Sequence, residues 1–254
     1  MESFRSVNAG RQPVISLQNV GVAYKVKAGF LRRRRVWALQ DVSFDVYEGE
    51  TLGVVGKNGA GKSTLLQVLT GIILPDRGLI TTRKDCRISL LSLQAGFVQP
   101  LTGRENAILS GLFFGIRPGT MKDMMDKVAD FSGLGAYMDQ PVNTYSTGMR
   151  ARLGFAVAFH ADPDIILIDE VLGVGDQEFK EKSEAAMRQK ISSNKTVVIV
   201  SHNANTILEL CDRVIWIENG ASKMVGLPAE VVGKYQEQIY SKRMNNITGQ
   251  VRTG

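Results

Sequence analysis

Short apolar runs alternate along the chain with segments in which apolar residues recur at helical spacing. Three runs, Thr51–Val55, Ile165–Ile168 and Thr196–Val200, are continuous and mostly aliphatic, which is typical of strands buried on both faces of a sheet. Further segments alternate between apolar and polar positions, a pattern that predicts strands with one buried face. These are Val14–Tyr24, Trp37–Val46, Leu79–Thr81, Ile88–Leu91 and a hairpin of Val214–Ile217 with Lys223–Val225.

Helical periodicity predicts where the intervening helices lie. The predicted helices are Thr64–Leu69, Met121–Phe131, Ala151–Phe159, Phe179–Ile191 and a last one that runs from Pro228 towards Tyr240. At about 100–160 the pattern is helical and rich in methionine and glycine, which predicts a helical subdomain inserted into an α/β chain. We therefore expect a flexible leader at 1–13, one domain at 14–243 and a polar tail at 244–254.

A glycine-rich turn, Gly56–Thr64, separates the first continuous run from the first predicted helix. It matches the pattern GxxxxGK[ST] in the strand-to-helix context that this pattern requires. Its glycines let several backbone N–H groups point at one anion, and the following helix adds its positive N-terminal end. We expect Lys62 to reach the β- and γ-phosphates of a nucleotide and Ser63 to ligate Mg²⁺. The rest of the phosphate-binding loop is Gly56, Asn58, Gly59, Ala60, Gly61 and Thr64.

Two acidic residues and a histidine follow the other continuous runs. Asp169 and Glu170 follow Ile165–Ile168, and His202 follows Thr196–Val200 by one residue. Ligands bind at the carboxyl ends of parallel strands, so these side chains are expected at the same sheet edge as the glycine-rich turn. We expect Asp169 to hold Mg²⁺ through water, Glu170 to orient or deprotonate the attacking water, and His202 to contact the γ-phosphate. These roles predict an ATP-hydrolysing enzyme.

Composition limits the cellular compartment of the protein but does not identify its binding partner. The chain of 254 residues carries a formal net charge of +6, which suits nucleic acid, anionic lipid or a phosphorylated substrate alike. No apolar run reaches the ~20 residues of a membrane-spanning helix, and Met1–Arg11 lacks the apolar segment of a secretory signal. We therefore expect a cytoplasmic protein, with Cys86 and Cys211 as reduced thiols.

The basic segment Phe30–Arg35 has two interpretations. It places four consecutive arginines after Phe30 and Leu31. A run of like charges is most often a solvated loop, so Lys25–Val36 is predicted to be a surface loop. The apolar pair beside the arginines also suits contact with anionic lipid headgroups or with a pyrophosphate.

The order of these features resembles that of an ABC-type ATPase domain, over roughly Val14 to Gly226. The resemblance includes the short motif Tyr145–Arg150, which follows the helical insertion and precedes a helix. It implies a P-loop NTPase of ABC type, with a mainly parallel core sheet, an antiparallel β subdomain and an inserted helical subdomain. It also implies a homodimer in which two ATP molecules lie between head-to-tail subunits. The implied contacts to the γ-phosphate on the other subunit are those of Ser146, Thr147 and Gly148.

The resemblance implies roles for further residues. Asp176 matches the loop after the catalytic glutamate, which communicates across the dimer. The aromatic residue that stacks on adenine is Tyr24 or Trp37, and both remain candidates. The glutamine that senses the γ-phosphate, ligates Mg²⁺ and contacts the membrane partner is expected in Leu93–Pro100. Gln94 is the better placed candidate and Gln99 is the second.

The signature motif departs from the common Leu-Ser-Gly-Gly-Gln and reads Tyr-Ser-Thr-Gly-Met at 145–149. This variant resembles that of the ATPase subunits of bacterial exporters of O-antigen, capsule and teichoic acid, as do Trp37–Leu39 and Leu101–Asn106. The effect of Thr147 and Met149 on the contact between subunits stays open. Some O-antigen members carry a carbohydrate-binding domain after the ATPase, and we expect none here because of the length of the chain.

We therefore expect the ATPase subunit of an exporter of lipid-linked polysaccharide, using ATP and Mg²⁺. It is expected to lie peripherally on the cytoplasmic face of the inner membrane, bound to an integral-membrane permease. Phe30–Arg35 is the candidate contact to the lipid-linked glycan, and no nucleic-acid partner is expected. The alternatives are another ABC exporter of lipids or drugs, a soluble ABC ATPase acting on nucleic acid or ribosomes, and a regulatory subunit with little turnover. The sequence names no glycan, lipid carrier or permease.

Overall fold

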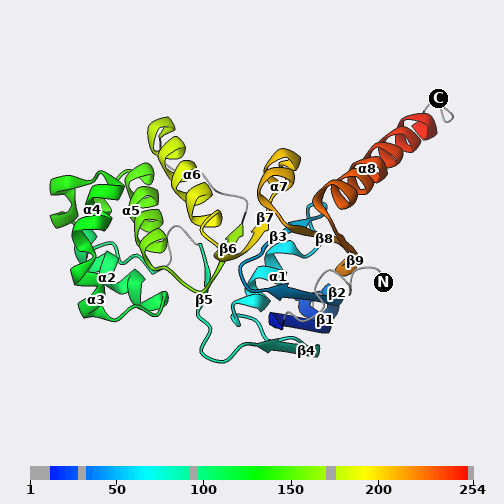
Figure 1. The fold of residues 1–254 in the computed structure, drawn as a ribbon, viewed down its shortest axis with the longest axis horizontal. Coiled ribbons are helices and arrows are strands. Elements are labelled where there is room, and N and C mark those ends of the chain that lie inside the picture. The colour runs from blue at the N-terminus through cyan, green and yellow to red at the C-terminus, as the bar shows by residue number, and fades with distance from the viewer. Residues whose placement is uncertain (1–11, 28–32, 92–95, 170–175, 251–254) are drawn as a thin grey trace. The chain divides into compact units, whose positions relative to one another are not determined.

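The computed structural model describes residues 12–27, 33–91, 96–169 and 176–250. The chain divides into two compact units, of which the first comprises 1–84 with 198–254 and the second comprises 85–197. Figure 1 follows the chain through both units. The glycine-rich turn lies in the first unit, and the helices of the predicted insertion lie in the second.

A mixed sheet forms the frame of the first unit. Its strands are β1 (Pro13–Lys27), β2 (Arg33–Tyr47), β3 (Thr51–Val55), β4 (Arg77–Thr82), β8 (Arg213–Glu218) and β9 (Ala221–Gly226). Their order is β4-β1-β2-β9-β8-β3. β3 pairs in parallel with β8 and β2 with β9, whereas β1–β2, β1–β4 and β8–β9 are antiparallel. The boundary between the units falls within β7 (Thr196–Val200).

The strands β1 and β2 are longer than predicted and form a two-stranded ribbon that reaches into both ends of the predicted loop. Their pairing continues to Lys27 opposite Arg33. The predicted loop at Lys25–Val36 is therefore wrong at both of its ends, while residues 28–32 lie outside the described part of the chain. Val26 lies between two lysines, and Val36 follows consecutive arginines. An exposed ribbon can carry these cations because long basic side chains reach water.

Helices α1 (Lys62–Leu69), α7 (Ala204–Leu210) and α8 (Pro228–Gln250) also belong to the first unit. α7 is too short to show a clear period, and it begins where the Asn203 side chain accepts the Asn205 N–H at 2.9 Å. α8 begins at the predicted proline but runs beyond the predicted boundary at 243. Val231 and Val232 of α8 pack against a buried cluster that includes Trp216.

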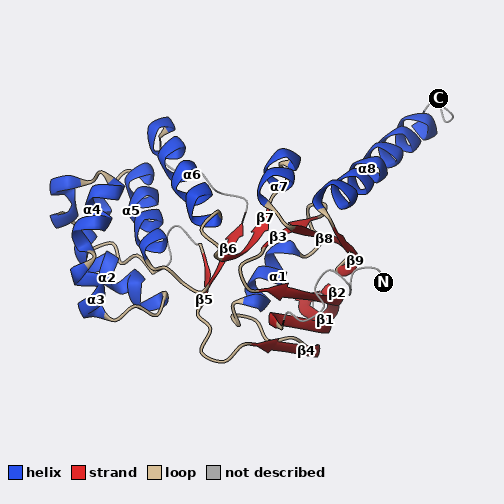
Figure 2. Cartoon of the chain, viewed as in Figure 1, coloured by secondary structure: helices blue, strands red, loops and turns tan. Residues whose placement is uncertain are grey.

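The second unit is mostly helical, as Figure 2 shows in blue. Its parallel pair of strands is β5 (Ile88–Leu90) and β6 (Ile165–Asp169). Its α-helices are α2 (Gly103–Phe113), α3 (Pro118–Asp123), α4 (Met125–Ser132), α5 (Thr147–His160) and α6 (Gln177–Ile191). Short 3₁₀ turns at Gly135–Asp139 and Val142–Thr144 lead into α5.

Two features of these helices differ from the prediction. The predicted helix Met121–Phe131 is interrupted at Met124. Met121, Met125 and Val128 are buried on the two sides of the break, so the apolar period continues across it and does not reveal the interruption. α2 lies within the predicted helical subdomain at about 100–160, but it was not predicted as a separate helix. Its start is marked by a capping box, in which Thr102 accepts the Glu105 N–H at 3.2 Å and Glu105 accepts the Thr102 N–H at 2.8 Å.

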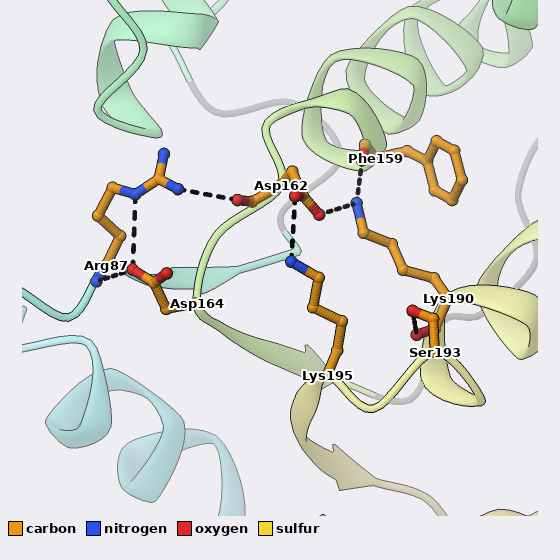
Figure 3. Close-up of polar contacts among 7 residues, drawn as sticks. All are labelled: Arg87, Phe159, Asp162, Asp164, Lys190, Ser193 and Lys195. Atoms are coloured by element: carbon orange, nitrogen blue, oxygen red, sulfur yellow. Dashed lines mark hydrogen bonds and ion pairs between the residues drawn. The ribbon is translucent and has the colours of Figure 1, made fainter. Parts of the chain in front are cut away.

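Asp162 joins several elements of the second unit (Figure 3). It lies in the turn between α5 and β6 with a φ of 45°. Its carboxylate accepts a hydrogen bond from Lys195 at 3.0 Å and lies 3.2 Å from the Lys190 ammonium. Its carbonyl accepts from Arg87 at 3.0 Å, and Lys190 also donates to the Phe159 carbonyl. The turn is thereby tied to the end of α6 and to the start of β7.

Replacing Asp162 with asparagine should destabilise the protein by about 1 kcal/mol, which corresponds to a melting temperature about 2–4 °C lower near neutral pH. Asparagine tolerates the left-handed φ, so the change leaves the backbone unstrained and removes the charge together with one of the two acceptor oxygens that the lysines contact. Burial raises the pKa of the Asp162 carboxyl, but hydrogen bonds from Lys195 and Lys190 outweigh it and hold the pKa below its usual value.

The stabilisation is therefore complete above the unfolded pKa of about 3.9 and is lost as the pH falls through the lower folded pKa. Calorimetric melting of both proteins between about pH 7 and about pH 3 should show the difference closing at acid pH. A difference that stays constant with pH would contradict an ionic origin.

Candidate functional site

The glycine-rich turn of the first unit forms a tight loop between β3 and α1. Gly59 and Gly61 adopt positive φ values of 78° and 103°, which other residues rarely reach. A Cβ atom on Gly61 would lie 2.5 Å from the Ala38 carbonyl oxygen, and one on Gly56 would lie 2.4 Å from the Ile217 carbonyl oxygen. Both glycines are therefore required by close packing of the loop onto its neighbours.

The ammonium of Lys62 lies along this loop. Lys62 is 7% exposed, and its Nζ donates to the carbonyl oxygens of Gly56 at 2.8 Å and Lys57 at 3.1 Å. Ser63 stands exposed in the first turn of α1, where backbone N–H groups have no acceptor within the helix. The Lys62 ammonium, the N-terminus of α1 and the tight glycine loop together suit the phosphate tail of a nucleotide. The Ser63 hydroxyl is a suitable ligand for Mg²⁺.

The register of β1 and β2 distinguishes the two candidate aromatic residues. Trp37 pairs with Ala23, so Trp37 and Tyr24 project from opposite faces of the ribbon. The Trp37 ring is occupied by two guanidinium groups, of Arg35 at 5.1 Å and of Arg77 at 4.6 Å. Tyr24 is 42% exposed, and its hydroxyl lies 3.5 Å from the Thr64 hydroxyl of α1. The geometry therefore favours Tyr24 as the residue beside a bound nucleotide.

We propose that Tyr24 stacks on the adenine, and Tyr24→Ala should weaken ATP binding about tenfold, since base–aromatic stacking is worth about 1–3 kcal/mol. Trp37→Ala should lower the melting temperature because it removes the surface between two arginines, yet change the Kd for ATP less than about twofold. Titration calorimetry with Mg-ATP and thermal melting of both variants separate the two effects. The opposite order of Kd values would assign the stacking to Trp37.

The signature motif lies at the start of α5 in the second unit. Ser146 is the N-cap of this helix, and its Oγ accepts the Met149 N–H at 3.1 Å. Ser146 and Thr147 are exposed. Among the described residues, a Cβ atom added to Gly148 would meet only the Ser146 Oγ, at 3.8 Å. This glycine is thus not required by packing inside the subunit.

Asp176 is the N-cap of α6, also in the second unit. Its Oδ1 accepts the Phe179 N–H at 3.0 Å, and its Oδ2 lies 3.8 Å from the Arg152 guanidinium of α5. Asp169 is the half-buried last residue of β6, as predicted from the sequence. In the first unit, His202 is exposed shortly after β7.

Glu170 and Gln94 lie outside the described residues, whereas Gln99 is exposed and its carbonyl accepts the Asn143 N–H at 3.0 Å. No cluster of metal-binding side chains is preformed among the described residues. Sequence reasoning missed Ala38 and Gly220, which shape the phosphate loop from behind. The backbone of each touches it, so no side-chain pattern marks them.

In this chain a glycine-rich loop joins strand β3 to helix α1, and the lysine of the loop points back along it. This arrangement defines the class of P-loop nucleotide hydrolases. Residues 39–173 match the family model described as ABC transporter. A teichoic acids export ATP-binding protein of Listeria monocytogenes is 37% identical over 93% of this chain and 74% of its own length. An O-antigen export system ATP-binding protein of Klebsiella pneumoniae is 37% identical over 89% of this chain and 98% of its own length.

The chain belongs to the ABC transporter family, and it is an ATPase whose hydrolysis is coupled to transport. A solved ATP-binding cassette, dimeric and bound to ADP and phosphate, has the same fold with a TM-score of 0.67 and 23% identity, over 84% of this chain and 98% of its own. The predicted ABC-type fold is thereby confirmed. Other curated relatives are longer, and the chain spans less than half of some of them. No described helix is long and apolar enough to cross a membrane.

Proposed function

We propose that this chain is the ATP-hydrolysing subunit that powers export of a lipid-linked polysaccharide across the cytoplasmic membrane. The names of its relatives, teichoic acid and O-antigen export ATP-binding proteins, support this substrate class. In this proposal the subunit lies peripherally on the cytoplasmic face and works with an integral-membrane permease. An exporter of another lipid or of a drug is the second candidate within the family.

We assign the steps of ATP hydrolysis to individual residues. Lys62 and His202 hold the γ-phosphate, and Glu170 accepts a proton from the attacking water. Mg²⁺, held by Ser63, Asp169 and Gln94, supplies charge neutralisation for the phosphates when it is bound. Ser63 lies in the first turn of α1 and Asp169 is the last residue of β6, and both positions are compatible with these roles.

The observation that carries the homodimer is the room beside Gly148, where a Cβ would meet no described atom of the subunit except the Ser146 Oγ. The exposed Ser146 hydroxyl and the N-terminus of α5 stand beside it, so this surface suits an anion brought by another molecule. We propose that the anion is the γ-phosphate of ATP bound to a second copy. ATP then closes the dimer because its phosphates contact both subunits, and hydrolysis removes that contact.

The function is tested by reconstituting the subunit with its permease in liposomes. Adding the lipid-linked polysaccharide of the same cells should raise phosphate release at least about threefold, as expected when substrate favours the hydrolytic state. DNA and RNA should leave the rate unchanged. Stimulation by nucleic acid that falls steeply with salt would instead favour a soluble ABC ATPase.

We further propose that the tip of the β1–β2 ribbon meets the anionic headgroup of the carrier lipid. On the described part of the ribbon, the exposed cations include Lys25, Lys27 and Arg34. Arg35 forms a salt bridge with Asp76. Cations near an anionic membrane surface contribute about 1 kcal/mol each. A ribbon with several cations near its tip suits a pyrophosphate or a charged lipid surface.

Changing Arg32–Arg35 to serine should lower polysaccharide export about tenfold, while basal ATP hydrolysis changes less than about twofold. Cell-surface polysaccharide in a deletion strain carrying the variant reports export, and phosphate release from the purified protein reports basal turnover. Serine at the exposed Lys122 and Lys127 of the second unit is the matched control. Equal losses of export and basal turnover, or no loss of either, would contradict the proposal.

A further inference from the structure

The β8–β9 turn braces the phosphate loop from behind. The Gly220 N–H donates to the Ala60 carbonyl at 3.1 Å, and the Gly220 carbonyl accepts the Gln40 N–H of β2 at 2.6 Å. One turn thus links the loop to the sheet on the far side. Because Gly56 packs directly on the Ile217 backbone, a shift of β8 or of its turn moves the phosphate loop as well.

The same turn is bound to helix α8 by a polar cluster. Lys223 of β9 donates to Glu218 at 2.5 Å and also to Gln238 of α8, and the Gln238 amide donates to Glu218. The Lys223 ammonium lies 4.0 Å from the centroid of the Trp216 ring. Tyr235 of α8 meets that ring edge-on at 5.4 Å. Charge and aromatic contacts therefore hold α8 against the end of β8.

A small cavity of about 220 Å³ lies between the phosphate loop and the end of β8. It is lined by Lys57, Asn58, Gly59, Ala60, Trp216, Ile217, Glu218 and Asn219. Trp216 and Glu218 thus contact α8 and also line the cavity beside the loop. The cavity lies against the loop, so the contacts that hold the loop on this side come from the turn behind it.

We propose that Gln238 and Glu218 are positioning residues through which the docking of α8 sets the affinity of the phosphate loop for nucleotide. The inference rests on the proposed function only in that the loop binds ATP. With α8 docked, Glu218 is held and Gly220 keeps the Ala60 carbonyl in place. Undocking of α8 releases the turn and lowers the affinity for ATP. α8 projects from the sheet in Figure 1, so a macromolecule that grips it can control this equilibrium.

Gln238→Ala tests the coupling, with Gln236→Ala as its control on an exposed position of the same helix. Titration calorimetry with Mg-ATP should give a Kd about fivefold higher for Gln238→Ala and unchanged for Gln236→Ala. Both variants are compared at a temperature well below their melting points, so that loss of folded protein does not enter. Equal Kd values for Gln238→Ala and the parent chain would overturn the proposal. If the parent chain itself binds no ATP, the proposed function fails instead.

Thermodynamic reciprocity supplies a second readout, which a merely structural role would not move. Binding of Mg-ATP should slow amide hydrogen exchange in residues 228–241 of the parent chain, and Gln238→Ala should abolish that protection. The Glu218→Ala variant should raise the Kd for ATP as Gln238→Ala does, and the double variant should add nothing further. Exchange in α8 that is indifferent to nucleotide would refute the coupling.

Discussion

Replacing Glu170 with glutamine should lower ATP turnover at least about a hundredfold, because general-base catalysis contributes about 10²–10⁴. Glutamine keeps the shape of the side chain and removes only its ability to accept the proton of the attacking water. Nucleotide binding should be retained, since Lys62 and the glycine loop supply it. Subunits that bind ATP and do not hydrolyse it should accumulate as closed dimers, which light scattering coupled to gel filtration detects.

Glu178→Gln is the matched control for this experiment. Glu178 is exposed in the first turn of α6, shortly after Glu170 in the sequence, and it has no role in the proposed chemistry. Its variant should hydrolyse ATP at the parent rate and remain monomeric after turnover. Normal phosphate release by Glu170→Gln would show that the catalytic base has been assigned to the wrong residue.

The sequence predicted the phosphate loop because its requirements are local. A buried strand, glycines at fixed offsets and a lysine before a helix are all readable within a dozen residues. The same holds for Asp169, since four aliphatic residues before an acid mark the end of a buried strand. These features needed no knowledge of how distant parts of the chain pack.

The remaining features depend on pairing between distant segments. The choice between Tyr24 and Trp37 follows from strand register, which puts Trp37 between Arg35 and Arg77. Spacing along one strand carries no such information. The loop predicted at Lys25–Val36 was wrong at its ends for a related reason. Charged residues are frequent in loops, but they are equally stable on an exposed pair of strands.

Gly148→Ala should abolish ATP hydrolysis without harming the fold. The variant therefore tests the proposed contact between subunits separately from contacts within one subunit. A Cβ here meets no atom closer than 3.8 Å in the part of the subunit that the structure describes. Alanine in a helix is up to about 1 kcal/mol more stable than glycine, so the melting temperature should hold or rise. A methyl group facing the γ-phosphate of the other copy should nevertheless lower turnover at least about a hundredfold, by displacing that anion from its donors.

Gly119→Ala provides the control, because Gly119 is likewise the second residue of a helix and no described atom lies within 4 Å of its Cβ position. Both variants should melt at or above the parent temperature, and both should bind one nucleotide per subunit through the unchanged phosphate loop. Only Gly148→Ala should lose turnover and fail to dimerise when combined with Glu170→Gln. Full activity of Gly148→Ala would mean that the space beside Ser146 stays empty during hydrolysis, and the anion would have to be held by one subunit alone.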